Sequence, residues 1–163
     1  MGTTSYAIAL GSNRRSRHGT PEATLRAAAA ALGVDRLSTI RSTPALGPAG
    51  RTFANAAAEL SSRLDPAELL ARLKALEREF GRRRGRRWGP RVLDLDIILW
   101  SEGPFAGGGL VIPHPAFRDR GFVLGPLAEL VPDWRDPLTG STVRQLLRRQ
   151  ARARPVDRIA DRS

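Results

Sequence analysis

The segment RWGPRVLDLDIILW, residues 87–100, carries two acidic residues, Asp94 and Asp96, inside an otherwise apolar run. Successive side chains of a β-strand point to opposite faces of a sheet, so both carboxylates would project from the same face. Their Cα atoms would lie roughly 6.5 to 7 Å apart, and the intervening apolar side chains would fill the opposite face. The pattern therefore predicts a half-buried strand over residues 92–100, with a pair of acids on its polar face.

Two helices are marked by their first and last residues. Thr20 before Pro21, and Asp65 before Pro66, each place a capping side chain ahead of a proline, as is typical of a helix N-terminus. A glycine ends each helical pattern, and the leucine-rich face of the second helix is interpreted as core, with Glu77 on or beside it. Further strands are expected at residues 6–10, 37–43 and 53–60.

The order strand, helix, strand, strand, helix, strand is typical of a ferredoxin-like α/β sandwich. This is an α+β fold with a mainly antiparallel sheet and helices packed on one face, which leaves the other face free to carry a site. A chain of 163 residues suits one domain over residues 1–163. We expect a basic, frayed tail at residues 150–163.

The composition predicts a partner of negative charge. The chain has 27 Lys and Arg residues against 16 Asp and Glu, a formal net charge of +11, which suits nucleic acid, an anionic membrane or a phosphate-rich small molecule. The absence of cysteine excludes disulfides and thiolate metal sites and favours a reducing compartment. Because no signal peptide and no apolar run of roughly 18 residues is found, we predict a cytoplasmic protein.

Two carboxylates so close together repel each other unless a positive charge lies between them. A neighbouring arginine could supply that charge. Mg²⁺ could also supply it, since its usual ligands are one or two carboxylates, several waters and substrate phosphates. Two such ions held roughly 3.5 to 4 Å apart can clamp a polyphosphate from both sides. The alternative is an exposed face whose acids form ion pairs and bind no metal.

A glycine-spaced run of arginines, residues 81–91, leads into the acidic strand. Such a segment could close over a polyphosphate and exclude water, as a lid does. Taken alone, the same run could be a solvated surface or a nucleic-acid patch. A nucleic-acid backbone would be repelled by the neighbouring acids in the absence of metal, so the sequence favours a small phosphorylated substrate.

His114 lies in the sequence IPHP, where two prolines are expected to hold its backbone extended. It has no metal-binding partner nearby in sequence, and its neutral ring is expected to donate a hydrogen bond to phosphate. The chain contains no GxxxxGK[ST] motif, so a P-loop has no support.

The segment RWGPRVLDLDIIL closely resembles the hallmark segment of the 6-hydroxymethyl-7,8-dihydropterin pyrophosphokinase family. Further blocks are similar to that family in the same order, and the resemblance covers roughly residues 5–133. These blocks are AIALGSN (7–13), STPALG (42–47), FANAA (53–57), LEREFGR (76–82) and IPHPAFRDRGFVLGPL (112–127). One departure lies at residues 107–109, which are all glycine where some relatives direct a basic residue toward ATP.

The resemblance implies that Asp94 and Asp96 bind two Mg²⁺ ions together with ATP, and that these acids act in catalysis with Arg82 and Arg91. It also implies two sets of substrate contacts. The ATP contacts would be Lys74, Glu77, Arg82, Trp88, Arg91, Ile97, His114 and Arg120. The pterin pocket would be formed by Thr43, Pro44, Leu46, Phe53, Asn55 and Phe122. A flat polar heterocycle suits aromatic faces above and below it, with an amide to read its edge.

The implied function is an ATP-dependent diphosphokinase of folate biosynthesis that transfers pyrophosphate to 6-hydroxymethyl-7,8-dihydropterin and releases AMP. Its partners would be these two small molecules, with no nucleic acid and no membrane, and the protein would be a monomer. Two alternatives stay open. One is an RNA-binding ferredoxin-like module, although the chain lacks an aromatic RNP-type strand. The other is a different nucleotidyl or phosphoryl transferase on the same scaffold.

Overall fold

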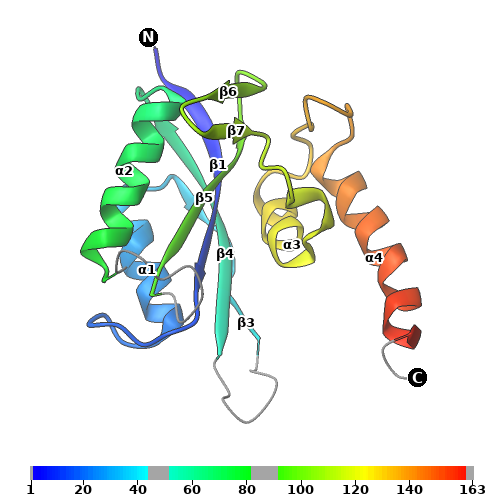
Figure 1. Cartoon of the computed structure of the whole chain (residues 1–163), viewed down its shortest axis with the longest axis horizontal. Helices are drawn as coiled ribbons and strands as arrows, with labels where there is room; N and C mark the ends of the chain where they lie inside the picture. Colours follow the sequence, from blue (N-terminus) through cyan, green and yellow to red (C-terminus); the bar gives the residue numbers. More distant parts are fainter. Residues whose placement is uncertain (1, 44–51, 82–91, 161–163) are drawn as a thin grey trace.

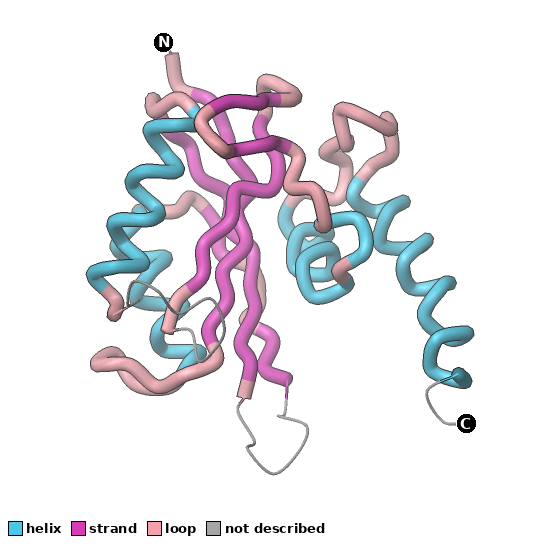
Figure 2. Tube along the Cα trace, viewed as in Figure 1, coloured by secondary structure: helices cyan, strands magenta, loops and turns pink. Residues whose placement is uncertain are grey.

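The structure, a computed structural model, describes residues 2–43, 52–81 and 92–160, whose elements are arranged around one central sheet (Figure 1, Figure 2). The strands are β1 (Thr4–Ser12), β2 (Arg36–Leu37), β3 (Arg41–Thr43), β4 (Phe53–Ser62), β5 (Asp94–Trp100), β6 (Phe105–Gly107) and β7 (Leu110–Ile112). The helices are α1 (Pro21–Leu32), α2 (Pro66–Glu79), the 3₁₀ turn η1 (Phe117–Asp119), α3 (Gly121–Leu130) and α4 (Val143–Ala160).

The central sheet has the strand order β2-β4-β1-β5, and β3 also pairs with β4. Every pairing in it is antiparallel. Strand β5 lies at the edge of the described sheet beside β1, with Asp94 opposite Gly11 and Asp96 opposite Ala9. The predicted α+β class with an antiparallel sheet is therefore confirmed.

Helices α1 and α2 begin where their capping residues predict. The side chain of Thr20 accepts a hydrogen bond from the N–H of Ala23 at 3.1 Å. Asp65 forms a capping box with Glu68, in which each side chain accepts from the other residue's backbone N–H. Gly33 ends α1 with a φ of 66°, a left-handed conformation that glycine adopts without steric penalty.

The main core lies between the sheet and these two helices, which cover one face of the sheet (Figure 1). Leu25 of α1 and Leu69 and Leu73 of α2 pack there with Leu93 and Leu95, which flank and separate the two acids in sequence. The face opposite the acids is therefore buried, as the alternation of residues 92–100 predicts.

The second face of the sheet is not free along its whole length, and here the expectation of helices on one face only is wrong. Helix α3 packs on this face, and α4 packs on α3 (Figure 1). Ala57 and Ile98 of the sheet form a second core cluster with Val123, Leu124 and Leu127 of α3. This cluster covers only part of the second face, so the remainder is left for a site.

The strand expected at residues 37–43 is divided into β2 and β3. Ser38 lies between them and donates its backbone N–H to the carbonyl of Ala57 at 2.9 Å. Its hydroxyl oxygen accepts the N–H of Ala57, also at 2.9 Å, where a strand would offer a backbone carbonyl. The side chain thus replaces one backbone group of the ladder, and the regular pairing stops for a few residues.

The C-terminal part of the described chain is more regular than its composition suggests, because α4 continues as a helix to Ala160. The glycine-rich connection forms a tight turn between β6 and β7, in which Gly108 and Gly109 have φ angles of 59° and 79°. Within the described residues, no helix is both long and apolar enough to cross a membrane.

Candidate active site

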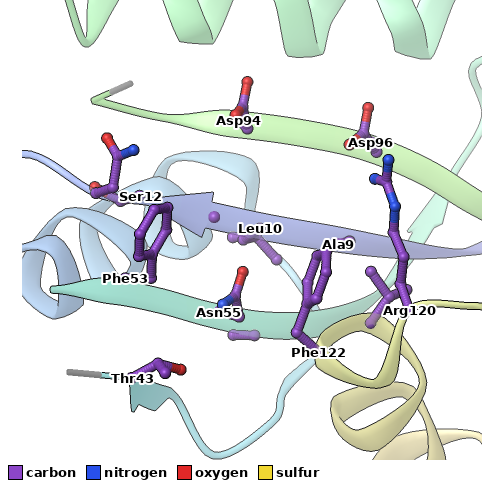
Figure 3. A pocket seen from close by; sticks show the side chains of 14 residues that line it. Ala9, Leu10, Ser12, Thr43, Phe53, Asn55, Asp94, Asp96, Arg120 and Phe122 are labelled. Carbon is purple, nitrogen blue, oxygen red and sulfur yellow. The ribbon is translucent and has the colours of Figure 1, made fainter. Parts of the chain in front are cut away.

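A cavity of about 630 Å³ opens on the uncovered part of the second face, a volume typical of a small-molecule site. It is bounded by β5 on one side, by the ends of β3 and β4 on another, and by the start of α3 (Figure 3). The cavity brings together a subset of the residues that the sequence singles out. They are Thr43, Phe53, Asn55, Asp94, Asp96, Arg120 and Phe122.

Asp94 and Asp96 reach the cavity from the same face of β5 (Figure 3). Their neighbours on β1 are Gly11 and Ala9, whose lack of bulk leaves space in front of the carboxylates. Among the described residues, no group of three or more His, Cys, Asp or Glu side chains could hold a metal ion. A cation at this pair would therefore need further ligands from a bound substrate or from water, which suits Mg²⁺.

Two exposed aromatic side chains lie on either side of Asn55 at the opposite side of the cavity (Figure 3). Phe53 is 47% exposed and Phe122 is 53% exposed, although large apolar side chains are usually buried. Asn55 lies opposite Gly11, and a methyl group added at Gly11 would lie 3.4 Å from the Asn55 Oδ1 atom. The amide therefore lies against the Gly11 backbone, between two aromatic faces suited to a flat ring.

Arg120 extends from the start of α3 toward Asp96, and its guanidinium lies 5.7 Å from the centre of the Phe122 ring (Figure 3). The turn η1, which directly precedes Arg120, is held in place by an ion pair on the side away from the cavity. Arg118 Nη2 donates to Oδ1 of the fully buried Asp136 at 2.8 Å, and its Nε donates to the other carboxylate oxygen. This bidentate pair lowers the pKa of Asp136 to about 2.

His114 does not line the cavity, but it lies close enough to Asp96 and Arg120 to interact with them electrostatically. Burial lowers the pKa of His114, the charge of Arg120 lowers it further, and Asp96 opposes the shift. The Nδ1 atom accepts the N–H of Ala116 at 3.2 Å, so a neutral ring carries its proton on Nε2. This tautomer is the one that can donate to an anion from Nε2.

Three other residues of the expected ATP set lie away from the cavity lining. Ile97 is buried in the main core. Glu77 is only 1% exposed, and its Oε2 atom accepts the N–H of Leu95 at 2.8 Å. Lys74, one turn earlier on α2, forms an ion pair with Glu77 at 3.2 Å. Glu77 therefore contacts the strand that carries the acids as well as Lys74 of its own helix.

The remaining expected residues fall outside the described part of the chain. They are Pro44 and Leu46 in the expected pterin set, and Arg82, Trp88 and Arg91 in the expected catalytic and ATP sets. Their roles stay predictions.

The sequence interpretation missed the floor of the cavity. The additional lining residues are Ala9, Leu10, Gly11, Ser12, Asn13, Ala56 and Val123. The signal for part of this set was present, because Ala9 and Gly11 are small residues two apart on a strand and so share one face. Which face they share depends on strand pairing, which the residues of one strand do not reveal.

Comparison with solved structures defines the fold class. A Plasmodium falciparum HPPK-DHPS structure with pterin and p-hydroxybenzoate superposes with a TM-score of 0.68 at 12% identity, over 91% of this chain and 42% of that chain. An HPPK-DHPS structure in complex with substrates gives a TM-score of 0.71 at 10% identity, over 94% of this chain and 45% of that chain. The chain thus has the fold found in part of those proteins.

Sequence comparison gives the family. The model of the 7,8-dihydro-6-hydroxymethylpterin-pyrophosphokinase (HPPK) family matches residues 7–132, and the chain therefore belongs to this family. A Synechocystis 2-amino-4-hydroxy-6-hydroxymethyldihydropteridine pyrophosphokinase is 44% identical over 118 residues, which cover 72% of this chain and 60% of that protein. The enzyme of the same name from Bacillus subtilis is 42% identical over 130 residues, 76% of this chain and 75% of that protein. The first of these matches thus spans about three fifths of its relative's length.

Proposed function

We propose that this chain transfers pyrophosphate from ATP to the hydroxymethyl group of 6-hydroxymethyl-7,8-dihydropterin and releases AMP, a step of folate biosynthesis. The observation that carries the proposal is a single cavity with two different walls. One wall presents the Asp94 and Asp96 carboxylates, and the other presents Asn55 between Phe53 and Phe122. Membership of the HPPK family and the names of its relatives support the same reaction.

The acidic wall suits the triphosphate. Magnesium would be held by Asp94 and Asp96, and the fit is chemical, since two hard carboxylate oxygens share one face of a strand at the rim of the cavity. Bound there, Mg²⁺ would neutralise charge on the phosphate groups. Arg120 lies on the same side of the cavity as Asp96 and would contribute a fixed positive charge to the phosphates.

The aromatic wall suits the pterin. The ring would lie between Phe53 and Phe122, and the Asn55 amide, which can both donate and accept, would bind its polar edge. A ring held there would direct its hydroxymethyl group across the cavity toward the acids. This geometry is what the reaction requires, because the two substrates must meet at one oxygen and one phosphorus.

In the proposed reaction the hydroxymethyl oxygen attacks the β-phosphorus of ATP, the bond from that phosphorus to the α-phosphate oxygen breaks, and AMP leaves. Asp94 would accept the hydroxyl proton. Arg120 and the Nε2–H of neutral His114 would bind phosphate oxygens and stabilise negative charge. Transfers of this type depend mainly on positioning and electrostatics, so a strong general base is not needed. Arg82 and Arg91 are predicted to add to this stabilisation.

The remaining expectations are part of the same proposal. They are a monomeric protein in the cytoplasm, with ATP and the pterin as its partners. A nucleic-acid-binding function is less well supported, since the acidic pair faces the cavity that a phosphate backbone would have to enter.

An AMP-release assay tests the proposal. The purified chain is incubated with ATP and Mg²⁺, with and without 6-hydroxymethyl-7,8-dihydropterin, and AMP is measured by chromatography. We expect AMP to form only when the pterin is present, in an amount equal to the pterin pyrophosphate. Release of AMP at the same rate without pterin would contradict the proposal. Transfer to a different alcohol in a screen of acceptors would favour another phosphoryl transferase.

A further inference from the structure

The buried carboxylate of Glu77 contacts the backbone of β5 between the two acids. Its Oε2 atom accepts the N–H of Leu95 at 2.8 Å. This N–H belongs to the peptide unit that joins Asp94 to Leu95, and Asp96 is the next residue. Glu77 is thus bonded to the segment whose geometry sets the spacing and direction of both cavity carboxylates.

The position of this contact in the sheet explains why it matters. Strand β5 has β1 on one side and no further strand on the other side within the described sheet. Leu95 is paired in register with Leu10 of β1, and the Leu95 N–H is directed instead to α2, where Glu77 accepts it. The acid-bearing start of β5 is therefore held by β1 on one side and by a helix side chain on the other.

A buried carboxylate at this position has a large desolvation cost. Glu77 is 1% exposed, and burial of an ionised group is strongly unfavourable unless hydrogen bonds and an opposite charge compensate for the lost water. The Leu95 N–H and the Lys74 ammonium, 3.2 Å from Oε1, supply such compensation. A charged acceptor also makes a stronger hydrogen bond to a backbone N–H than a neutral acceptor does.

We propose that Glu77 is a positioning residue for the acidic pair. By fixing the peptide between Asp94 and Leu95, it holds the two carboxylates at the separation and direction with which they bind a divalent cation. In this role Glu77 acts on the acidic pair through the backbone of β5, which its Oε2 atom contacts at the Leu95 N–H. This inference rests on the proposed function, because it takes Asp94 and Asp96 as the cation ligands.

Three substitutions of Glu77 distinguish the effect of where its acceptor oxygen lies from the effects of its charge and of its packing. Glu77→Gln keeps an acceptor oxygen at the same reach and removes the charge. Glu77→Asp keeps the charge and withdraws the carboxylate by one methylene from the Leu95 N–H. Glu77→Leu removes the acceptor. Glu79→Gln, Glu79→Asp and Glu79→Leu are the matched controls, since Glu79 is an exposed acid on the same helix.

The main measurement is cation affinity rather than turnover. Free Mn²⁺ is monitored by electron paramagnetic resonance while the whole chain, with a nonhydrolysable ATP analogue, is titrated with Mn²⁺. Substitution of groups that orient metal ligands weakens metal binding by roughly 10- to 100-fold. We expect a loss of that size for Glu77→Asp and Glu77→Leu, and a change below about threefold for Glu77→Gln and the Glu79 variants.

Circular dichroism melts establish that each variant is folded. If Glu77→Leu does not fold, the Mn²⁺ affinities of Glu77→Asp and Glu77→Gln are compared instead. Both variants keep a polar side chain of similar size, so this comparison still tests whether the position of the acceptor sets cation affinity. In the pyrophosphate transfer assay, we expect the Mg²⁺ concentration for half-maximal rate to rise in the variants with lower Mn²⁺ affinity, Glu77→Asp and Glu77→Leu. The KM for the pterin should stay unchanged in both. A purely structural role would change stability without this selective effect.

The outcomes distinguish this inference from the proposed function. Equal Mn²⁺ affinity in folded Glu77→Asp, Glu77→Gln and the unsubstituted chain would overturn the positioning role alone. A loss in Glu77→Gln as large as that in Glu77→Asp would also overturn it, because charge and not acceptor position would then be responsible. If the unsubstituted chain binds no Mn²⁺ with the analogue, the proposed cation site fails and the inference fails with it.

Discussion

The guanidinium of Arg120 lies over the ring of Phe122, with its central carbon 5.7 Å from the ring centre. Arg120 is the N-cap residue of α3, Phe122 is on its first turn, and both line the cavity. Arg120 is directed to the acidic wall and Phe122 belongs to the aromatic wall (Figure 3). The contact therefore joins the proposed phosphate-binding and pterin-binding halves of the site.

Replacement of Arg120 should affect both substrates, but unequally. Arg120→Gln removes a positive charge that we expect to contact phosphate, a contribution of about 1.5 to 3 kcal/mol, so the KM for ATP should rise at least about tenfold. It also removes a cation–π contact worth about 0.5 to 1 kcal/mol, so the pterin KM should rise only a few-fold. Steady-state kinetics with each substrate varied provides the test. Arg152→Gln, on the exposed face of α4, is the control. An unchanged KM for ATP in Arg120→Gln would contradict the proposed contact between Arg120 and phosphate.

Neutralising either member of the acidic pair should abolish most activity without unfolding the protein. Asp94→Asn and Asp96→Asn keep the shape of the side chain but remove the charge that would hold a cation, and turnover should fall by at least about a hundredfold. Both side chains are partly exposed, so the melting temperature should change little. Asp133→Asn, at a surface aspartate whose side chain is 82% exposed, is the control. Near-normal turnover in Asp96→Asn would rule out the proposed cation site.

Loss of the Asn55 amide should weaken pterin binding selectively. Asn55→Ala removes hydrogen bonds whose loss typically amounts to about 1 to 3 kcal/mol when a partner is left unsatisfied. The dissociation constant of the pterin should therefore rise by roughly 5- to 150-fold, and that of the ATP analogue should stay unchanged. Calorimetric titrations with each ligand measure this difference. Ser61→Ala, on the exposed end of the same strand, provides the comparison, and equal losses for both ligands would show that Asn55 does not read the pterin.

The ion pair between Arg118 and the buried Asp136 should make the free energy of unfolding depend on pH in the acid range. The pKa of Asp136 is lowered from 3.8 to about 2, so the native state favours the ionised form. This contribution, about 2 kcal/mol, is fully present above pH 3.8 and is lost as the pH falls through about 2. Asp136→Asn should therefore lower the free energy of unfolding at pH 7 and have a smaller effect near pH 2.

Urea unfolding of Asp136→Asn and the unsubstituted chain at several pH values checks this dependence. Asp133→Asn serves as the exposed control again. A difference in the free energy of unfolding that stays constant from pH 7 to pH 2 would show that the loss comes from packing rather than from the ion pair.

The elements that the sequence predicts best are those specified by neighbouring residues. Helix α1 begins after Thr20 and ends before Gly33 because a hydroxyl cap and a left-handed glycine act within one turn of the chain. The two faces of β5 follow in the same way from strict alternation. The break at Ser38 could not be predicted, because it depends on a hydrogen bond to Ala57 on another strand.

Helix α3 shows a different limit of sequence interpretation. Its sequence contains two glycines and an internal proline, which are poor helix formers. The apolar side chains Val123, Leu124 and Leu127 nevertheless stabilise it by packing on the sheet. The guanidinium of Arg41, from β3, occupies the space beside Gly125 that a side chain would otherwise fill. Such contacts between distant segments are not visible in a local pattern.

In the candidate site, too, some residues can be predicted from the sequence and others depend on contacts between distant segments. Sequence alone indicates the acids, the exposed aromatics and Asn55, because residue type and resemblance select them. It does not indicate Ala9 and Gly11, whose contribution is the space that they leave free between β5 and β4. It also does not reveal that Glu77 is directed to the backbone of Leu95, since that depends on how α2 meets β5.

The two ends of β1 lie far apart, which determines where the protein can be attached to a surface. Ser12 at one end of this strand lines the cavity, and Thr4 lies at the other end, roughly 25 Å away for a strand of this length. An affinity tag or surface linker attached ahead of Thr4 would therefore stand well clear of the cavity mouth. The protein could be immobilised through that end for ligand screening by surface plasmon resonance, with its binding face turned toward the flowing solution.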